Sequence, residues 1–332
     1  LGRESELTII DEADRTVTIN IPIERVITTW RGQLETLRSI GAADKVVGVE
    51  SYAVECTKDF FPEFSDVTTV GTVWEPDIEL ILSLHPDIVI LFPGEGYGAT
   101  NLDIAQDKLE TSGLTVLRFT WTTEKTSIPE IRKLGYIFGK RNEAEELIEF
   151  YGKVLNSIEE KVECISEEDM PKVYFEWDRY KTAGIYYNIG LSGGKDIFAD
   201  CEAPEIDPEA VIERDPEIII NMVWMPGITW GYDVDDTADL EETREEVMNR
   251  PELQNVTAVK DGNVYIITGH LTFGPYCGSR DFIRIAYFAK WFHPDLFEDL
   301  DPKAIHQEYL TRFHGLDIDL NEKGVFVYPP LE

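Results

Sequence analysis

Six of the seven tryptophans in this 332-residue chain follow segments that the sequence predicts to be β-strands. They are Trp30, Trp74, Trp121, Trp177, Trp224 and Trp230, and Tyr52, Tyr97, Tyr180, Tyr186, Tyr187 and Phe273 lie in similar predicted loops. In an open parallel sheet the ligand crevice lies beyond the carboxyl ends of the strands. Aromatic rings in that position suit a large, flat, partly apolar ligand held by stacking, although any single tryptophan could instead fill a core.

The same loops also carry polar side chains and glycines. The polar residues are Arg31, Glu75, Glu95, Asp178, Arg179, His270 and, near the start of a predicted helix, Arg280. Arginine in an aromatic crevice favours a carboxylate, phosphate or other anion on the ligand, and a surface role is the alternative for each one. Gly94, Gly96 and Gly98 permit close approach of backbone, but they lack the spacing of a phosphate-binding fingerprint.

Catalytic and metal-binding signals are weak. Neither an HExxH nor a CxxC pattern is present, and of the five histidines only His270 ends a predicted strand. His270 could be an axial ligand or a hydrogen-bond donor to a bound chelate, or a structural loop residue. A bare metal ion would need three or four convergent ligands. We therefore expect no enzyme activity and no intrinsic cofactor, and we expect any metal to arrive already chelated.

The elements that position these residues alternate between strand and helix. Predicted strands are 7–10, 16–19, 26–29, 46–49, 67–70, 88–92, 116–120, 171–175, 218–221 and 264–268; predicted helices are 33–40, 77–84, 102–112, 127–139, 207–213, 279–292 and 302–313. The first two strands form a hairpin, and Ser127 with Glu130 suggests a capping box. Residues 226–250 are expected to be an acidic surface insertion. Alternating elements predict mostly parallel sheets covered by helices.

A long central helix and a repeat divide the chain. Apolar residues recur every three or four positions through 142–165, which predicts one helix of roughly 36 Å with Asn142 as its N-cap. Residues 79–90 (ELILSLHPDIVI) and 209–220 (EAVIERDPEIII) share the order helix, proline and apolar strand. Two similar α/β lobes on either side of a rigid helix explain this pattern.

Composition narrows the setting. Sixty-four acidic and thirty basic residues give a net charge of −34, which makes nucleic acid an unlikely partner. No apolar run is long enough to cross a bilayer. The chain begins at Leu1 without a methionine, which fits a processed extracytoplasmic protein with an anchor in a removed segment. Cys56, Cys164, Cys201 and Cys277 could be disulfides or buried thiols.

Several segments together resemble the substrate-binding proteins of ABC importers for iron-siderophore, haem and vitamin B12. They are DEADRTVTI, PIERVITT, IGAADKVVGV, the two repeat segments, AVKDGNVYII and YFAKWFHPDLFEDLDPKAIHQEYLTRF, and they extend over nearly the whole chain. The resemblance implies two Rossmann-like αβα lobes with a helical connection, here 1–140 and 167–332 joined by 141–166. It also implies capture of a ligand between the lobes, outside the membrane, and its delivery to a permease.

The resemblance gives the repeated glutamates a role. One glutamate in each lobe of such proteins pairs with arginines of the permease dimer, and the matching positions are Glu79 and Glu209. The partner is then a permease dimer with its ATPase, and the binding protein is expected to be a monomer. The other interpretation is that glutamate is simply favoured in the first turn of a helix. Glu35 and Glu75 are nearby alternatives for docking.

Three kinds of ligand fit this class. A ferric siderophore suits the aromatic residues and arginines, and a corrinoid or haem suits the tryptophans, with His270 or Tyr187 near the metal. A small oxyanion such as molybdate or tungstate would need backbone amides and hydroxyls, which Thr28, Thr29 and Ser51 could supply. The expected ligand-binding residues are Trp30, Arg31, Tyr52, Trp74, Tyr97, Trp121, Trp177, Arg179, Tyr187, Trp224, His270, Phe273 and Arg280. A chelatase-like enzyme on the same fold is the most remote alternative.

Overall fold

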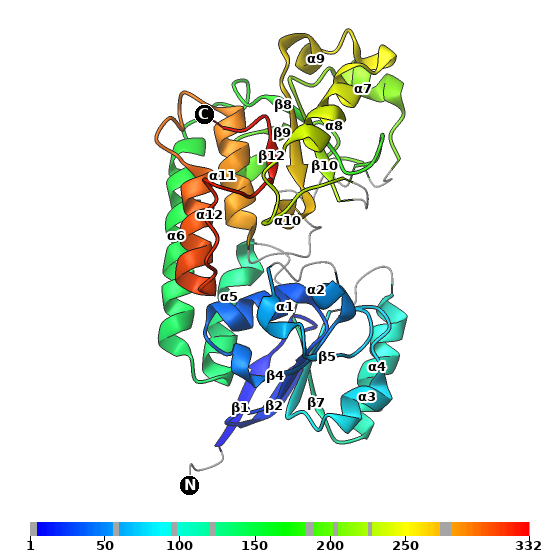
Figure 1. The fold of residues 1–332 in the computed structure, drawn as a ribbon, viewed down its shortest axis with the longest axis vertical. Coiled ribbons are helices and arrows are strands. Elements are labelled where there is room, and N and C mark those ends of the chain that lie inside the picture. The colour runs from blue at the N-terminus through cyan, green and yellow to red at the C-terminus, as the bar shows by residue number, and fades with distance from the viewer. Residues whose placement is uncertain are drawn as a thin grey trace. The chain divides into compact units, whose positions relative to one another are not determined.

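The computed structural model describes residues 5–55, 60–93, 98–119, 124–182, 189–201, 205–224, 228–272 and 280–331. The chain divides into two compact units. Unit 1 contains the described residues of Leu1–Phe150 together with Arg312–Leu316, and unit 2 contains those of Tyr151–Pro275, Arg280–Thr311 and Asp317–Glu332. In each unit a sheet lies between helices, so the predicted α/β class with mostly parallel sheets is confirmed (Figure 1).

Unit 1 is built on a five-stranded parallel sheet with the order β5-β4-β3-β6-β7. Its elements are β1 (Ser5–Ile10), β2 (Thr16–Ile21), β3 (Val26–Thr28), α1 (Arg31–Ser39), β4 (Val46–Val49), α2 (Ser51–Glu55), β5 (Thr68–Thr69), α3 (Ile78–Ser83), β6 (Ile88–Leu91), α4 (Ala99–Thr111), β7 (Thr115–Arg118) and α5 (Glu124–Ile137). Strands β1 and β2 form the predicted antiparallel hairpin, with Leu7 opposite Ile19.

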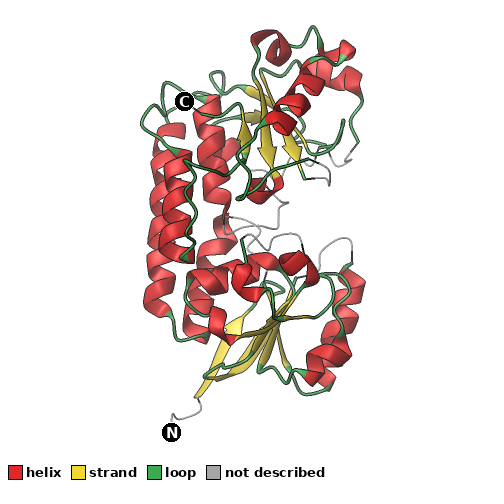
Figure 2. Cartoon of the chain, viewed as in Figure 1, coloured by secondary structure: helices red, strands yellow, loops and turns green. Residues whose placement is uncertain are grey.

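Both faces of this sheet are buried. On one face Val89 and Leu91 of β6 pack with Ile81 of α3 and Leu109 of α4. The intervening strand residues, such as Ile88, are also fully buried, and α1 contacts β3 and β4. Continuous burial along a short strand is the signature of a parallel sheet covered on both sides. Figure 2 shows the helices that flank this sheet.

Unit 2 has the sheet order β12-β11-β10-β8-β9, in which only the β11–β12 pair is antiparallel. Its elements are β8 (Lys172–Glu176), β9 (Lys195–Asp196), α7 (Pro208–Arg214), β10 (Ile218–Val223), α8 (Ala238–Met248), α9 (Thr257–Asp261), β11 (Val264–Thr268), α10 (Gly269–Thr272), α11 (Asp281–Phe292) and β12 (Val327–Tyr328). Helices α7, α8 and α9 supply Val211, Val247 and Val259 to one cluster on the sheet. On β8, Phe175 contacts Phe288 of α11.

Two helices are shared between the units. Helix α6 (Arg141–Val162) has 22 residues, and the division between Phe150 and Tyr151 falls inside it. The division also falls inside α12 (Pro302–His314). The apolar stripe predicted for the long helix is buried at Ala144, Leu147, Ile148, Tyr151, Val154, Ile158 and Val162. No helix in the described ranges combines the length and the apolar character needed to cross a bilayer.

Three local predictions were wrong. Asn142 is not an N-cap because α6 already begins at Arg141. Ser127 does not cap a helix either, because α5 begins at Glu124 and Ser127 lies buried inside it. Residues 228–250 are not a surface insertion: they contain α8, and the side chains of Tyr232, Leu240 and Val247 are fully buried. The acidic residues that concealed the buried positions are exposed and lie both before and within α8: Asp233, Asp235, Asp236, Glu241, Glu242, Glu245 and Glu246.

The sequence repeat is also a structural repeat. Asp77 caps α3 by accepting a hydrogen bond from the Leu80 N–H at 3.0 Å, and Asp207 caps α7 through the Glu209 N–H at 2.9 Å. After each helix a residue with positive φ precedes the proline: His85 (φ 48°) after α3 and Asp215 (φ 45°) after α7. Strands β6 and β10 then follow. Each copy therefore makes the same sharp change of direction into its sheet.

Candidate functional site

In both sheets the strand order reverses between two central strands. In unit 1 the reversal lies between β3 and β6, and in unit 2 it lies between β8 and β10. Such a switch point opens a crevice at the carboxyl ends of the strands, because the connections on either side leave in opposite directions. The residues that directly follow these four strands are therefore the first candidates for ligand contact.

At the switch point of unit 1 three aromatic rings come together. Trp30 follows β3 and meets the edge of Phe92, which follows β6, at a centroid distance of 5.6 Å. Trp74 contacts Phe92 from a separate loop at 5.1 Å. Trp30 is 5% exposed, so most of its ring supports the site from beneath. Phe92 was missed from the sequence because it read as the last residue of a strand.

Arg31 lies next to this cluster. Its guanidinium lies 4.4 Å from the Trp30 ring centroid and 4.8 Å from that of Tyr52, and the residue is 3% exposed. Glu50 is nearby and accepts a hydrogen bond from the Tyr52 N–H at 2.7 Å. Burial raises the pKa of Glu50 to about 7, against the opposing effect of the Arg31 charge. Arg31 and Tyr52 are thus brought together, with Arg31 buried and Tyr52 half-buried.

A pocket of about 430 Å³ lies beside Trp74. Its described lining includes Thr72 and Glu75 from the loop of Trp74, and Ala99, Thr100 and Asn101 from the first turn of α4. Gly98 precedes α4 with φ 82°, and a Cβ atom there would lie 2.5 Å from the Trp74 ring. Glycine is therefore required for the backbone to pass so close to the indole.

At the switch point of unit 2 two tryptophans take the corresponding places. Trp177 follows β8 and Trp224 follows β10, and their ring centroids lie 6.2 Å apart. The indole N–H of Trp224 donates to the Trp177 carbonyl oxygen at 3.0 Å. This bond fixes the orientation of one ring relative to the other strand end. Trp230, by contrast, packs against the core cluster that contains Val223 and Leu240.

A buried ion pair holds the turn that follows Trp177. Arg250 donates to both carboxylate oxygens of Glu176 at 2.8 Å, and the two side chains are 3% and 0% exposed. Glu176 also accepts the Tyr180 N–H at 2.5 Å and an Asn221 N–H at 3.2 Å. Tyr180 has φ 54°, a backbone region that costs a non-glycine residue about 1 kcal/mol or more. The carboxylate of Glu176 therefore stabilises a strained turn.

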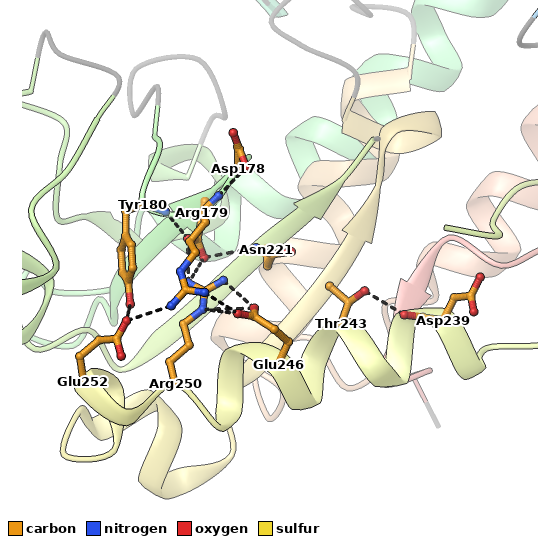
Figure 3. A network of polar contacts seen from close by, with 10 residues as sticks. Asp178, Arg179, Tyr180, Asn221, Asp239, Thr243, Glu246, Arg250 and Glu252 are labelled. Carbon is orange, nitrogen blue, oxygen red and sulfur yellow. Dashed lines mark hydrogen bonds and ion pairs between the residues drawn. The ribbon is translucent and has the colours of Figure 1, made fainter. Parts of the chain in front are cut away.

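Acidic side chains extend this network to the surface (Figure 3). Glu246 of α8 pairs with Arg250 at 2.8 Å and with Arg179 at 3.3 Å. Glu252 pairs with Arg179 at 3.2 Å and accepts the Tyr180 hydroxyl at 2.6 Å. That hydroxyl is the largest cause of a lowered pKa at Glu252. Arg179 is 55% exposed and is held by two carboxylates at the strand end. The pairing of residues 176 and 250 could not be read from the sequence.

The other predicted ligand residues have different settings. Arg280 is 2% exposed and donates to the Tyr232 hydroxyl at 3.4 Å, beside His306. Burial lowers the pKa of His306 to about 3, so this histidine is neutral. His270 lies in α10, directly after β11, but its side chain is outside the described part. Tyr97, Trp121, Tyr187 and Phe273 also lie outside the described residues.

Hydroxyl groups that might bind an oxyanion are partly used within the fold. The Thr29 hydroxyl donates to the Ile90 carbonyl oxygen at 3.2 Å, and Thr28 and Thr29 are 1% and 0% exposed. Residues 190–194 (GLSGG) match the G-x-S-x-G pattern of serine hydrolases, a match that sequence reasoning missed. Ser192 is fully buried in a 3₁₀ helix and donates to the Ile285 carbonyl oxygen at 3.2 Å, so it has the setting of a structural residue. Within the described ranges no three His, Cys, Asp or Glu side chains gather to hold a metal ion.

Glu79 and Glu209 occupy equivalent positions in the repeat. Each is the second residue of its helix, two residues after the capping aspartate, and each side chain is exposed. The alternatives differ: Glu35 is fully buried, whereas Glu75 is exposed and lines the pocket beside Trp74. The structure thus presents one equivalent carboxylate on each unit.

Two α/β units with aromatic residues at their switch points define the class of a two-unit ligand-binding protein. Residues 26–271 match the family model for periplasmic binding protein, and the chain belongs to that family. The chain is similar to the uncharacterized ABC transporter substrate-binding lipoprotein YvrC of Bacillus subtilis. The two sequences are 25% identical over 306 residues, which are 88% of this chain and 87% of that protein.

Two further proteins are similar over most of the chain. A cobalamin-binding protein of Halobacterium salinarum is 24% identical over 277 residues, which are 79% of this chain and 68% of that protein. Among solved structures, the TroA-like periplasmic binding protein FepB of Veillonella parvula superposes with a TM-score of 0.79 at 23% identity, covering 96% of this chain and 98% of that one. The structural likeness shows the fold.

Proposed function

We propose that this chain is the extracytoplasmic substrate-binding protein of an ABC importer, and that its cargo is a metal chelate such as a corrinoid, a haem or a ferric siderophore. Membership of the periplasmic binding protein family and the ABC substrate-binding role in the name of YvrC support the transport role. The chelate is inferred from one observation: each switch point carries a pair of large aromatic rings, Trp30 with Phe92 and Trp177 with Trp224.

The aromatic pairs favour a large cargo for a physical reason. Trp177 and Trp224 are partly exposed, and stacking of their rings on a chelate would bury area that a small oxyanion does not have. Trp30 and Phe92 are 5% and 3% exposed and support the site from beneath. A small oxyanion needs a tight set of donors, and the Thr29 hydroxyl is already committed to the Ile90 carbonyl oxygen. In this proposal the chain binds without catalysis and has no intrinsic cofactor, because the metal belongs to the cargo.

Binding of a panel of probes tests this proposal. The purified chain is titrated with cyanocobalamin, haemin, ferrichrome and molybdate in an isothermal titration calorimeter, and tryptophan fluorescence is recorded in parallel. We expect saturable binding of at least one chelate with strong quenching, because tryptophans lie at both switch points. The variant Trp177→Ala should weaken that binding at least about tenfold, a cost of about 1.4 kcal/mol. Binding of molybdate alone, or of no probe, would overturn the chelate proposal.

Delivery is proposed to use Glu79 and Glu209. Equivalent exposed carboxylates on the two copies of one repeat suit a symmetric partner that presents the same arginine twice, as a permease dimer with its ATPase would. In this proposal a monomeric binding protein meets that dimer. Uptake into proteoliposomes that carry the cognate transporter should be abolished by Glu79→Ala with Glu209→Ala, while the affinity for cargo is unchanged.

A matched control separates docking from charge. Glu163→Ala with Glu213→Ala removes the same charge from two other exposed positions, and Glu213 lies on the same helix as Glu209. The control should leave uptake near the wild-type rate. Loss of cargo affinity in the Glu79 and Glu209 variant, or equal loss of uptake in the control, would contradict the docking role.

A further inference from the structure

Basic side chains at the strand ends of unit 2 are already matched by carboxylates. Arg179 pairs with Glu246 and Glu252, and Lys181 pairs with Asp178 at 2.8 Å. Arg250 is bound by Glu176 and Glu246. The network contains four carboxylates, Glu176, Asp178, Glu246 and Glu252, and three basic side chains, Arg179, Lys181 and Arg250. Its formal charge is negative by one unit, so an arriving anion would have to compete with carboxylates already in place.

The strand ends of unit 1 have the same character. The guanidinium of Arg31 is buried between two aromatic rings, beside Glu50. In the described lining of the pocket beside Trp74, Glu75 is the one ionisable side chain. The N-terminus of α4 adds a partial positive charge of about half a unit, which Glu75 opposes. A neutral ligand with amide carbonyl groups can accept hydrogen bonds there without meeting uncompensated repulsion.

Two further observations point the same way. Arg280, the other predicted basic contact, is buried against the Tyr232 hydroxyl. The whole chain carries a net charge of −34, and a field of that sign lowers the local concentration of anions. The local ion pairs and the long-range field of the chain therefore both disfavour the binding of an anionic ligand.

We propose that the strand ends of each unit favour an uncharged or cationic metal chelate and discriminate against anionic ones. This inference rests on the proposed function and narrows it. Amide-rich corrinoids and neutral or cationic ferric hydroxamates fit, whereas ferric catecholates, haem with its propionates, and oxyanions do not. In this proposal Glu246 and Glu252 neutralise the charge of Arg179, and contact with the aromatic rings determines the affinity for the chelate.

Matched probes that differ only in charge test the inference. One pair is cyanocobalamin and a derivative in which propionamide side chains are hydrolysed to carboxylates. The other pair is cationic ferrioxamine B and its anionic N-succinyl derivative. Calorimetry on the full chain should show the anionic member of the bound pair at least about tenfold weaker, with the difference shrinking as salt is added. Equal or tighter binding of the anionic member would overturn the charge selection and leave the chelate function standing.

A variant locates the effect. Glu252→Gln removes one carboxylate from Arg179 and keeps an oxygen acceptor for the Tyr180 hydroxyl. It should strengthen binding of the anionic probe several-fold and leave that of the neutral probe unchanged. The control Glu242→Gln makes the same change of charge at an exposed position of α8 and should alter neither. Equal gains in both variants would overturn the role of Arg179, and binding of no probe would overturn the proposed function itself.

Discussion

The two copies of the repeat have similar frameworks at the amino ends of their strands and different side chains at the carboxyl ends. In unit 1 Asp87 accepts the N–H groups of Glu24 and Arg25 at 2.8 Å, just before β3, and in unit 2 Glu217 accepts that of Lys172 at 2.9 Å, at the start of β8. Arg25 in turn donates to the Leu84 carbonyl oxygen, and Lys172 to that of Arg214.

Beyond the strand ends the two units diverge. After β3 a cation lies between aromatic rings, and after β8 a buried ion pair holds a strained turn. The amino ends of the strands thus hold the framework in the same way twice, while the carboxyl ends carry different side chains. The repeat therefore determines where the candidate site lies in each unit, whereas the side chains that form the site differ between the units.

The largest expected effect comes from the ion pair of Glu176 and Arg250 in unit 2, in which both side chains are buried. Arg250→Met leaves the buried carboxylate of Glu176 without its cation, which should lower the free energy of unfolding by about 3–5 kcal/mol. The corresponding change in unit 1, Arg31→Met, removes a cation–π contact and should cost about 1–2 kcal/mol. Urea unfolding measures both. The double variant Glu176→Gln with Arg250→Met should recover much of the loss; equal costs in the two units would break the comparison.

A smaller effect concerns pH and unit 1. The pKa of Glu50, about 7 in the folded chain, is above the value of about 4.3 for an unfolded glutamate, so the unfolded chain releases the proton first as pH rises. The stability contributed by protonated Glu50 is complete below about pH 4 and is lost as pH rises through about 7. Glu50→Gln should reduce the loss of stability between about pH 5 and 8 by up to about 3 kcal/mol.

The control for this prediction is Glu149→Gln, which removes a charge at an exposed position of the same unit. It should leave the pH dependence of unfolding nearly unchanged. Part of the wild-type dependence should survive in Glu50→Gln, because burial also raises the pKa of Glu130 to about 7. An unaltered pH profile in Glu50→Gln would show that this carboxylate titrates normally in the folded chain.

The smallest effect tests the equivalence of the repeats. Asp77→Ala and Asp207→Ala each remove an N-cap of the same type and should each lower the free energy of unfolding by about 1 kcal/mol. The asparagine variants at both positions should be close to wild type, since asparagine caps well. A cost at one position and none at the other would show that the two copies are not energetically equivalent.

The fold was readable from the sequence because its signals are local. An apolar strand after a proline and a stripe along a helix are visible within about twenty residues, and β6, β10 and α6 appear close to their predicted ranges. Strands β9 and β12 were not predicted. Each has two residues, as does β5, which was found because it lies in the β-branched run 67–70. The helix ends at Ser127 and Asn142 were misplaced because a good capping residue can also lie inside a helix.

The candidate site was readable only in part. Aromatic residues after strands could be found because a strand end is a local feature, and Trp30, Trp177 and Trp224 do lie at the switch points. The ion pair of Glu176 and Arg250 joins residues 74 positions apart, and the sequence around either residue contains no signal that predicts the pairing. The sequence predicted that Arg179 contacts an anionic ligand. In the structure it pairs with two carboxylates from different elements, Glu246 and Glu252, which are distant from it in the sequence.

The division of the helices has a consequence for how the chain is made. Arg312–Leu316 belong to unit 1, where the Nδ1 atom of His314 accepts a hydrogen bond from Arg38 at 2.7 Å and the imidazole packs on Phe60. During synthesis the first 150 residues therefore leave the ribosome long before the piece that completes their core. Unit 1 can complete its packing only after almost the entire polypeptide has been synthesised. A fragment that stops at Phe150 should therefore be a poor candidate for independent expression.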